Sequence, residues 1–379
     1  MTIFNVPYLT GQELSYIKDT VERGKISGDG YYTKKCHAFF EEKYNFKKAL
    51  LTTSCTDALE LAALLINIQP GDEVIMPSYT FVSTANPFIL RGAKIVFVDS
   101  RTDHPGLDEQ AIESLITPRT KAIVVVHYAG VACDMDLIDA IAKKHQLFVI
   151  EDAAQAIDSY YKNRPLGSLG HLAAFSFHET KNIMCGEGGL LAINDSQFSG
   201  RAEIMREKGT NRSAFFRGEI DKYGWVDVGS SFLPSDILAA FLFAQVENLE
   251  QIQEKRKHIW QKYNEGLQGL AEKNLLTLPY IPDFATNNAH MFYLVCKSLE
   301  ERSALIDFLK ENEVQAVFHY QSLHKSPFFK SYSSEKSLPQ SDRYTDCLLR
   351  LPMYYTLTDS KIEYITQKIK EFYELPSNG

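Results

Sequence analysis

The fold is decided by one stretch, which reads Ser176-Phe177-His178-Glu179-Thr180-Lys181-Asn182 and continues to Cys185-Gly186-Glu187-Gly188-Gly189. An apolar run, 173–177, leads into it, and a second apolar run, 190–193, follows its glycines. The order of strand, loop, turn and strand can bring the amine of Lys181 into a pocket. A functional role is worth considering, because loops carry function more often than cores do. Most lysines are solvated surface residues, so this stretch alone favours the surface interpretation.

The composition is that of an ordinary globular protein with room for two domains. The chain has 379 residues, of which 45% are apolar and 23% charged. Its net charge of -8 is spread along the sequence, which argues against a nucleic-acid-binding surface. No apolar run reaches the ~18 residues of a membrane span, and the first residues lack a signal-peptide pattern. We therefore expect a cytoplasmic protein that does not bind membranes.

The six cysteines are far apart and form no C-x-x-C pair, so the sequence indicates neither a metal site nor a disulfide framework.

Short apolar runs alternate with helical stretches from about residue 48 to about residue 195. Strands that are buried on both faces and alternate with helices indicate βαβ units and a mostly parallel sheet. Such sheets bind ligands beyond the carboxyl ends of their strands. The expected strands are 49–51, 73–76, 94–98, 122–126 and 147–150, and helices are expected at 56–66 and 135–144.

The second half of the chain predicts a smaller domain. A long helical pattern runs from Ser235 to about Leu267, with apolar residues at three- and four-residue spacing. We expect this helix to connect a large domain, 1–250, to a small domain, 251–379. Within the small domain, strands are expected at 290–296 and 314–320, and helices at 302–311 and 362–373.

Two polar segments follow predicted strands. The first strand runs through Thr53, Ser54, Cys55 and Thr56 directly into a helix. The free N–H groups and positive end of a helix can bind a phosphate, although a simple helix cap by Ser54 or Thr56 is the commoner role. The strand 147–150 runs into Glu151-Asp152-Ala153-Ala154-Gln155. A buried carboxylate there needs a cationic partner such as a protonated ring nitrogen, and a helix cap is the equal alternative.

An aromatic pair, Tyr79 and Phe81, follows the strand 73–76. Either ring can stack on a planar ligand or pack in the core, and the sequence does not choose between them. Together, an amine, an acid, a phosphate site and a stacking face are what pyridoxal phosphate requires. A nicotinamide oxidoreductase is disfavoured, because no G-x-G-x-x-G follows the first strand.

The ordered motifs of the chain resemble the signature of the nucleotide-sugar aminotransferases, a pyridoxal phosphate family of fold type I. The resemblance implies an α/β fold with a mostly parallel central sheet between helices, a smaller C-terminal α/β domain, and a homodimer with shared active sites. The motifs are Asp152-Ala153-Ala154-Gln155, Ser176-Phe177, Lys181, Gly186-Glu187-Gly188-Gly189, Gly24 to Gly30, Thr80 to Ala85, Leu323-His324 and Leu351-Pro352.

The same resemblance assigns roles to residues. Lys181 would hold the cofactor and move the proton, and Asp152 would keep the ring nitrogen protonated. Ser231 stands where many members have an asparagine that reaches across the dimer to the cofactor phosphate. The further cofactor contacts that it implies are Thr53, Ser54, Cys55, Thr56, Phe81, Gln155 and Ser176. The substrate contacts that it implies are Lys25, Asn211, Arg212, His319 and Tyr320; no metal is implied.

Within the family, the segment 208–223 is similar to the branch that aminates dTDP-4-dehydro-6-deoxy-D-glucose at C4, with L-glutamate as the donor. The product of that branch, dTDP-4-amino-4,6-dideoxy-D-galactose, is used in surface polysaccharide such as enterobacterial common antigen. Amination of another nucleotide keto-sugar, at C3 or with gluco stereochemistry, stays open. A pyridoxal phosphate-dependent sugar dehydratase is disfavoured, because the known C3-deoxygenating branches usually carry histidine in place of Lys181. A non-catalytic cofactor-binding protein is disfavoured because both Lys181 and Asp152 are present.

Overall fold

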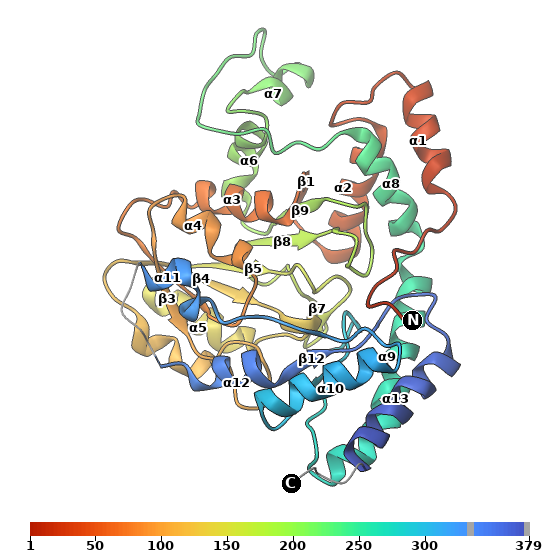
Figure 1. The fold of residues 1–379 in the computed structure, drawn as a ribbon. Helices are drawn as coiled ribbons and strands as arrows, with labels where there is room; N and C mark the ends of the chain where they lie inside the picture. The colour runs from red at the N-terminus through yellow and green to blue at the C-terminus, as the bar shows by residue number, and fades with distance from the viewer. Residues whose placement is uncertain (332–336, 375–379) are drawn as a thin grey trace.

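A seven-stranded sheet forms the centre of the protein, whose computed structural model describes residues 1–331 and 337–374 (Figure 1). The strand order is β1-β9-β8-β5-β4-β2-β3. All neighbouring strands are parallel except β9, which runs antiparallel to both β1 and β8. The predicted mostly parallel α/β sheet is therefore confirmed. The strands are β1 (Lys48–Thr52), β2 (Glu73–Pro77), β3 (Lys94–Val98), β4 (Thr120–Val126), β5 (Phe148–Asp152), β8 (Leu172–Ser176) and β9 (Gly189–Ile193).

Helices cover both faces of this sheet (Figure 1). Alternate strand residues enter different cores: Ile123 and Val125 lie in one, and Ala122 and Val124 in the other. This two-sided burial is why the strands are continuous apolar runs in the sequence. One face is covered by α2 (Tyr31–Tyr44), α5 (Met135–His145) and α8 (Asp236–Glu247), and the other by α3 (Cys55–Leu65), α4 (Asn86–Ile89) and α6 (Ser199–Arg206).

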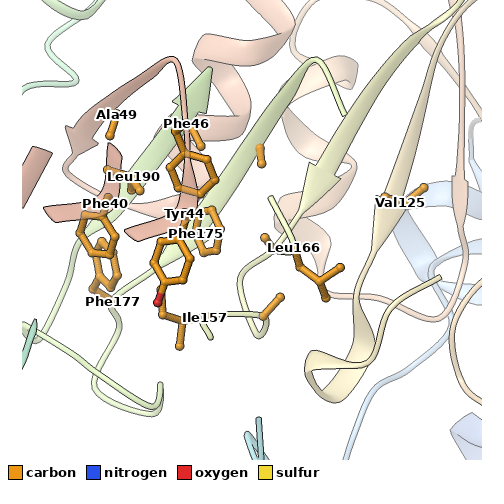
Figure 2. Packing of buried hydrophobic residues seen from close by; sticks show 14 of the residues in the cluster. Phe40, Tyr44, Phe46, Ala49, Val125, Ile157, Leu166, Phe175, Phe177 and Leu190 are labelled. Atoms are coloured by element: carbon orange, nitrogen blue, oxygen red, sulfur yellow. The ribbon is translucent and has the colours of Figure 1, made fainter. Parts of the chain in front are cut away.

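An aromatic cluster fixes the end of β8, from which the lysine loop departs (Figure 2). Phe177, the first residue after β8, is fully buried and stacks on Phe40 of α2 with ring centroids 5.5 Å apart. Phe175 packs on Phe46 with the two rings tilted and their centroids 5.7 Å apart. The start of the loop is therefore held between the sheet and α2.

A second, three-stranded antiparallel sheet has the order β10-β12-β11. Its strands are β10 (Tyr293–Val295), β11 (Val317–Phe318) and β12 (Leu348–Arg350), and α9 (Leu249–Glu272), α10 (Leu299–Glu311) and α13 (Asp359–Glu374) share its core. The predicted strands at 290–296 and 314–320 are longer than the observed ones, and the central strand β12 was not predicted. The boundary between a large and a small domain at residue 250 stays a prediction. The N-terminal residue Thr2 pairs with Val314 beside the small sheet.

The single long helix predicted from Ser235 to Leu267 is wrong, because α8 and α9 are separate helices with Asn248 between them. The Asn248 side chain donates to the carbonyl of Ala244 at 2.9 Å, and local bonds of this kind compete with helix continuation. The break lets α8 pack on the large sheet while α9 packs on the small one.

The remaining elements belong to neither of these two sheets. None of the described helices is long and apolar enough to cross a membrane. These elements are α1 (Glu13–Glu22), α7 (Arg212–Phe216), α11 (Pro327–Lys330), α12 (Pro339–Cys347) and the short pair β6 (Tyr160–Tyr161) and β7 (Arg164–Pro165).

Replacing Phe40 with Ala should lower the free energy of unfolding by ~3–5 kcal/mol, because it leaves a cavity between α2 and β8. Urea titration followed by circular dichroism measures the change. Leu90→Ala, at a side chain 71% exposed, is the control and should cost less than ~0.5 kcal/mol. Equal losses in the two variants would show that the aromatic cluster does not fix α2.

Candidate active site

A cavity of about 660 Å³ opens at the carboxyl ends of the parallel strands. Its volume is within the range of sites for small molecules. The large sheet contributes the last residues of β4, β5 and β8 together with the start of α3, and the small sheet contributes Arg350 and residues 318–321. Both parts of the chain therefore build one site.

Most of the predicted site residues line this cavity. Thr53 does not, because its hydroxyl binds the Asp57 carboxylate and its N–H donates to the carbonyl of Phe232 at 3.0 Å. Ser231 is exposed and pairs with Glu207 outside the cavity. The predicted residues that line the cavity are Ser54, Cys55, Thr56, Phe81, Asp152, Gln155, Ser176, Lys181, His319 and Tyr320.

Three predicted substrate contacts lie away from the cavity within one chain. Lys25 donates to the carbonyl of Asp29 at 3.1 Å. Asn211 accepts from the N–H of Gly224 at 2.8 Å, and Arg212 lies over the ring of Phe216. None of these three side chains lines the cavity of its own chain.

The start of α3 is shaped to hold a phosphate. Ser54 caps the helix by accepting from the N–H of Asp57 at 3.0 Å, whereas the N–H groups of Cys55 and Thr56 have no acceptor among the described residues. A Cβ at Gly189 would lie 2.3 Å from the Ser54 carbonyl, so only glycine lets β9 begin this close to the helix. Free N–H groups at the positive end of a helix are a ready anion site, which fits the cofactor phosphate.

Asp152 is a buried carboxylate at the end of β5, with 6% of its surface exposed. It accepts from the hydroxyl of Thr84 at 2.7 Å and from the N–H of Ala154 at 3.2 Å. Burial raises the pKa of Asp152, while these hydrogen bonds and the positive charge of Lys181 oppose the rise. A protonated ring nitrogen would be a suitable partner for this acid.

Lys181 lies half-buried in the cavity wall, in the loop between β8 and β9. The next residue, Asn182, anchors the loop by donating to Gln253 at 2.7 Å and to the carbonyl of Asn288 at 2.9 Å. Burial lowers the pKa of Lys181 to about 8, and the charge of Arg350 acts in the same direction. The neutral, nucleophilic fraction of the amine near neutral pH is therefore larger than that of a free lysine, whose pKa is ~10.4.

The two candidate stacking rings have different places. Tyr79 is buried, whereas Phe81 lines the cavity with 54% of its surface exposed. Tyr320 lies beside Phe81, with ring centroids 5.9 Å apart, and its hydroxyl accepts from the Gln155 amide at 3.2 Å. Gln155 also accepts from the N–H of Ala129 at 2.6 Å, which fixes its orientation. Phe81, and not Tyr79, is thus available to a ligand.

Arg350 and His290 also line the cavity, and neither was predicted as a site residue from the sequence. His290 contacts the loop that carries Lys181, because its Nδ1 lies 2.9 Å from the Asn182 Oδ1. Arg350 ends the unpredicted strand β12. The available signal was one charged residue inside an otherwise apolar run, 348–353.

Known proteins similar to this chain identify its family. Residues 7–370 match the DegT/DnrJ/EryC1/StrS aminotransferase family. The chain is 32% identical over 377 residues to the spore coat polysaccharide biosynthesis protein SpsC of Bacillus subtilis. The aligned region covers 97% of this chain and 96% of SpsC.

Two solved structures have the same fold across nearly the whole chain. The aminotransferase TlmJ from Streptoalloteichus hindustanus has a TM-score of 0.90 at 27% identity, and 99% of each chain is covered. The sugar aminotransferase Spr1654 from Streptococcus pneumoniae, in its PLP form, has a TM-score of 0.90 at 25% identity, with 98% of each chain covered. Spr1654 has also been solved in a PMP form.

A lysine, a buried acid and a free helix N-terminus around one cavity of this sheet define a pyridoxal phosphate-dependent enzyme. The chain belongs to the DegT/DnrJ/EryC1/StrS aminotransferase family. The predictions of the fold type I architecture, of a sugar aminotransferase and of pyridoxal phosphate as cofactor are confirmed.

In the cofactor-free protein, the Lys181 amine should titrate near pH 8, because burial lowers its pKa to about 8. Short pulses of acetic anhydride at a series of pH values, read by mass spectrometry, measure the neutral fraction, since the protonated amine does not react. Asp152→Asn removes a negative charge that raises this pKa, so its midpoint should move to lower pH. A wild-type midpoint near the free-lysine value of ~10.4 would contradict the prediction.

Proposed function

We propose that this enzyme transfers the amino group of L-glutamate to the 4-keto carbon of dTDP-4-dehydro-6-deoxy-D-glucose. The products are dTDP-4-amino-4,6-dideoxy-D-galactose and 2-oxoglutarate, and the reaction takes place in the cytoplasm. The observation that carries the chemistry is the presence of Lys181 and Asp152 in one cavity at the edge of the sheet. The choice of sugar rests on the resemblance of segment 208–223 to the C4-aminating branch.

A role in surface polysaccharide synthesis, of the enterobacterial common antigen type, is part of this proposal. It is supported by the name of SpsC, a spore coat polysaccharide biosynthesis protein, which is similar to this chain along almost its full length.

Bound pyridoxal phosphate supplies an aldehyde for covalent attachment and a ring that accepts electrons. Lys181 would hold the cofactor, and its free amine would carry a proton to and from the donor Cα. Its pKa of about 8 suits this task, because general acid–base catalysis works best when the pKa is near the operating pH. Asp152 holds the proton on the ring nitrogen, and the hydroxyl of Thr84 orients its carboxylate.

The other lining residues bind and orient the cofactor. The N–H groups of Cys55 and Thr56 and the hydroxyl of Ser176 would hold the phosphate. Phe81 would stack on the ring, and Gln155 would lie near the ring hydroxyl. Thr53 would act indirectly, since its hydroxyl binds Asp57 at the start of α3.

A homodimer with shared active sites is the assembly that we propose. The segment 211–231 carries three exposed aromatic side chains: Phe216 at 68%, Tyr223 at 51% and Trp225 at 82%. Exposed apolar groups gathered on one segment mark an interaction surface. In such a dimer Lys25, Asn211, Arg212 and Ser231 would reach the partner's cavity, where the hydroxyl of Ser231 would bind the phosphate, directly or through a water.

The main test is incubation of the purified enzyme with L-glutamate and dTDP-4-dehydro-6-deoxy-D-glucose. NMR of the product should show an axial amine at C4, as in the galacto configuration. An equatorial amine, amination at C3 or loss of a hydroxyl would instead identify the gluco product, another keto-sugar or dehydration.

Lys181→Ala should lower turnover by at least ~10³-fold and abolish the visible absorbance of the bound cofactor, because the amine that holds it is gone. Lys162→Ala, at an exposed lysine paired with Asp136, is the matched control and should keep both. A Lys181→Ala enzyme with normal absorbance and turnover would refute the assigned role.

Trp225→Glu should convert the dimer to monomers, because it places a charge among the exposed apolar side chains of segment 211–231. Sedimentation velocity measures the mass. Tyr280→Glu, at a side chain 45% exposed elsewhere on the surface, should leave the dimer intact. A Trp225→Glu variant that remains dimeric would show that this segment is not part of the interface.

A further inference from the structure

A hydrogen-bond network ties the loop that carries Lys181 to the second half of the chain. The side-chain amide of Asn182 donates to Gln253 of α9 at 2.7 Å and to the carbonyl of Asn288 at 2.9 Å. On its other side, the Asn182 Oδ1 lies 2.9 Å from His290 Nδ1. The N–H of His290 in turn donates to Asn288 Oδ1 at 3.0 Å. The His290 ring is therefore held in a fixed place beside the loop.

This network decides which nitrogen of His290 carries a hydrogen. A carbonyl can only accept, so the Asn182 atom that faces the Asn288 carbonyl is the amide nitrogen. The Asn182 atom that faces His290 is then the oxygen, which can also only accept, so His290 Nδ1 donates. Burial lowers the pKa of His290 well below its usual value. The ring is therefore neutral, and its Nε2 has a lone pair and no hydrogen.

The lone pair of His290 Nε2 has no donor within the chain. His290 lines the cavity with 3% of its surface exposed, and its Nε2 accepts no hydrogen bond within residues 1–331 and 337–374. With Nδ1 turned to Asn182, Nε2 is the nitrogen that stays available to the cavity. A buried acceptor needs a donor, and a ligand that fills the cavity takes away the water that could supply one.

A donor without a partner lies close by: the amine of Lys181. Both side chains line the cavity, and His290 contacts Asn182, the residue that follows the lysine. Among the charges that lower the pKa of His290, that of Lys181 acts most strongly. The amine forms no hydrogen bond or ion pair with the part of the chain that the structure describes, and its four-carbon stem can turn. An unpaired donor and an unpaired acceptor therefore share one cavity.

We propose that His290 is a positioning residue for the Lys181 amine, whose hydrogen bond its Nε2 accepts when the cofactor fills the cavity and the amine is free. This contact favours the protonated amine, because a hydrogen bond to a charged form stabilises that form. A neutral amine that donates to Nε2 keeps its own lone pair available to take a proton. The inference rests on the proposed role of Lys181 in proton transfer and names the residue that holds the amine in that same site.

Other ionisable groups also act on Lys181 or His290, and they come from several elements around the cavity. They are Cys55 of α3, Asp152 of β5, Arg256 of α9, His319 after β11, and Arg350 of β12. All of them stay in place when His290 alone is substituted. A change in the titration of Lys181 between such variants therefore reports on the His290 side chain.

The two nitrogens of His290 can be tested separately. Asparagine keeps a donor at the place of Nδ1 but does not reach the place of Nε2, whereas glutamine reaches the place of Nε2 and loses the donor at Nδ1. The cofactor-free enzyme is loaded with pyridoxamine phosphate, which carries its own amine and leaves Lys181 free. Pulses of acetic anhydride at a series of pH values, read by mass spectrometry, then give the pH midpoint of the Lys181 amine.

In the loaded enzyme, His290→Asn should lower this midpoint by about 1 pH unit, because the protonated amine loses its acceptor. His290→Gln should titrate close to wild type but unfold at lower urea concentration, because the hydrogen bond to Asn182 is lost. Without the cofactor, His290→Asn should shift the midpoint much less, since water can solvate the amine. His145→Asn, at a histidine outside the cavity that pairs with Glu113, is the matched control and should behave as wild type.

A loaded His290→Asn enzyme with the wild-type midpoint would overturn the proposal. Equal shifts in His290→Asn and His290→Gln would overturn it as well, because they would trace the effect to the general structure of the loop. The titration uses neither L-glutamate nor the keto-sugar, so a wrong choice of sugar leaves its result readable. A Lys181→Ala enzyme with normal turnover would instead refute the role of the lysine itself.

Discussion

The buried carboxylate of Glu151 joins the three strands on which the active site depends. It accepts hydrogen bonds of 2.6 to 2.8 Å from backbone N–H groups in the loop 167–170 and lies 2.9 Å from His127 Nε2. His127 follows β4, Glu151 belongs to β5, and the loop leads into β8. A fully buried carboxylate is tolerated only when such partners satisfy it. The strand that leads to Lys181 is thereby fixed relative to Asp152.

Three ionisable side chains of the active site, Asp152, Lys181 and Arg350, are buried or half-buried in the protein without a ligand. Burial raises the pKa of Asp152 and lowers the pKa values of Lys181 and Arg350, so each charged form is disfavoured. A cofactor with a phosphate and a protonated ring, and a donor with a carboxylate, supply the missing counter-charges.

Local sequence signals predict the large sheet and the chemistry at its edge well. Each strand that the apolar runs predicted in the large sheet is present in the structure. Lys181 and Asp152, which follow such runs, line one cavity. The break at Asn248 was missed because the apolar pattern continues through it. Arg350 was missed because its significance depends on contacts with Phe4 and the cavity, far away in sequence. The position of Ser231 outside the cavity was not predicted, because it depends on the pairing of Ser231 with Glu207, which is distant in sequence.

Cys55 lines the same cavity as Lys181, so an aldehyde bound there meets two potential nucleophiles. Burial and the nearby charge of Asp152 raise the pKa of the Cys55 thiol well above its usual value, whereas burial lowers that of the lysine. Burial favours the neutral form of each group, so the thiol is the unreactive protonated form and the amine is more often the reactive unprotonated form. Since the thiolate is the nucleophilic form of cysteine, the protonated Cys55 thiol is the weaker competitor for an aldehyde in this cavity.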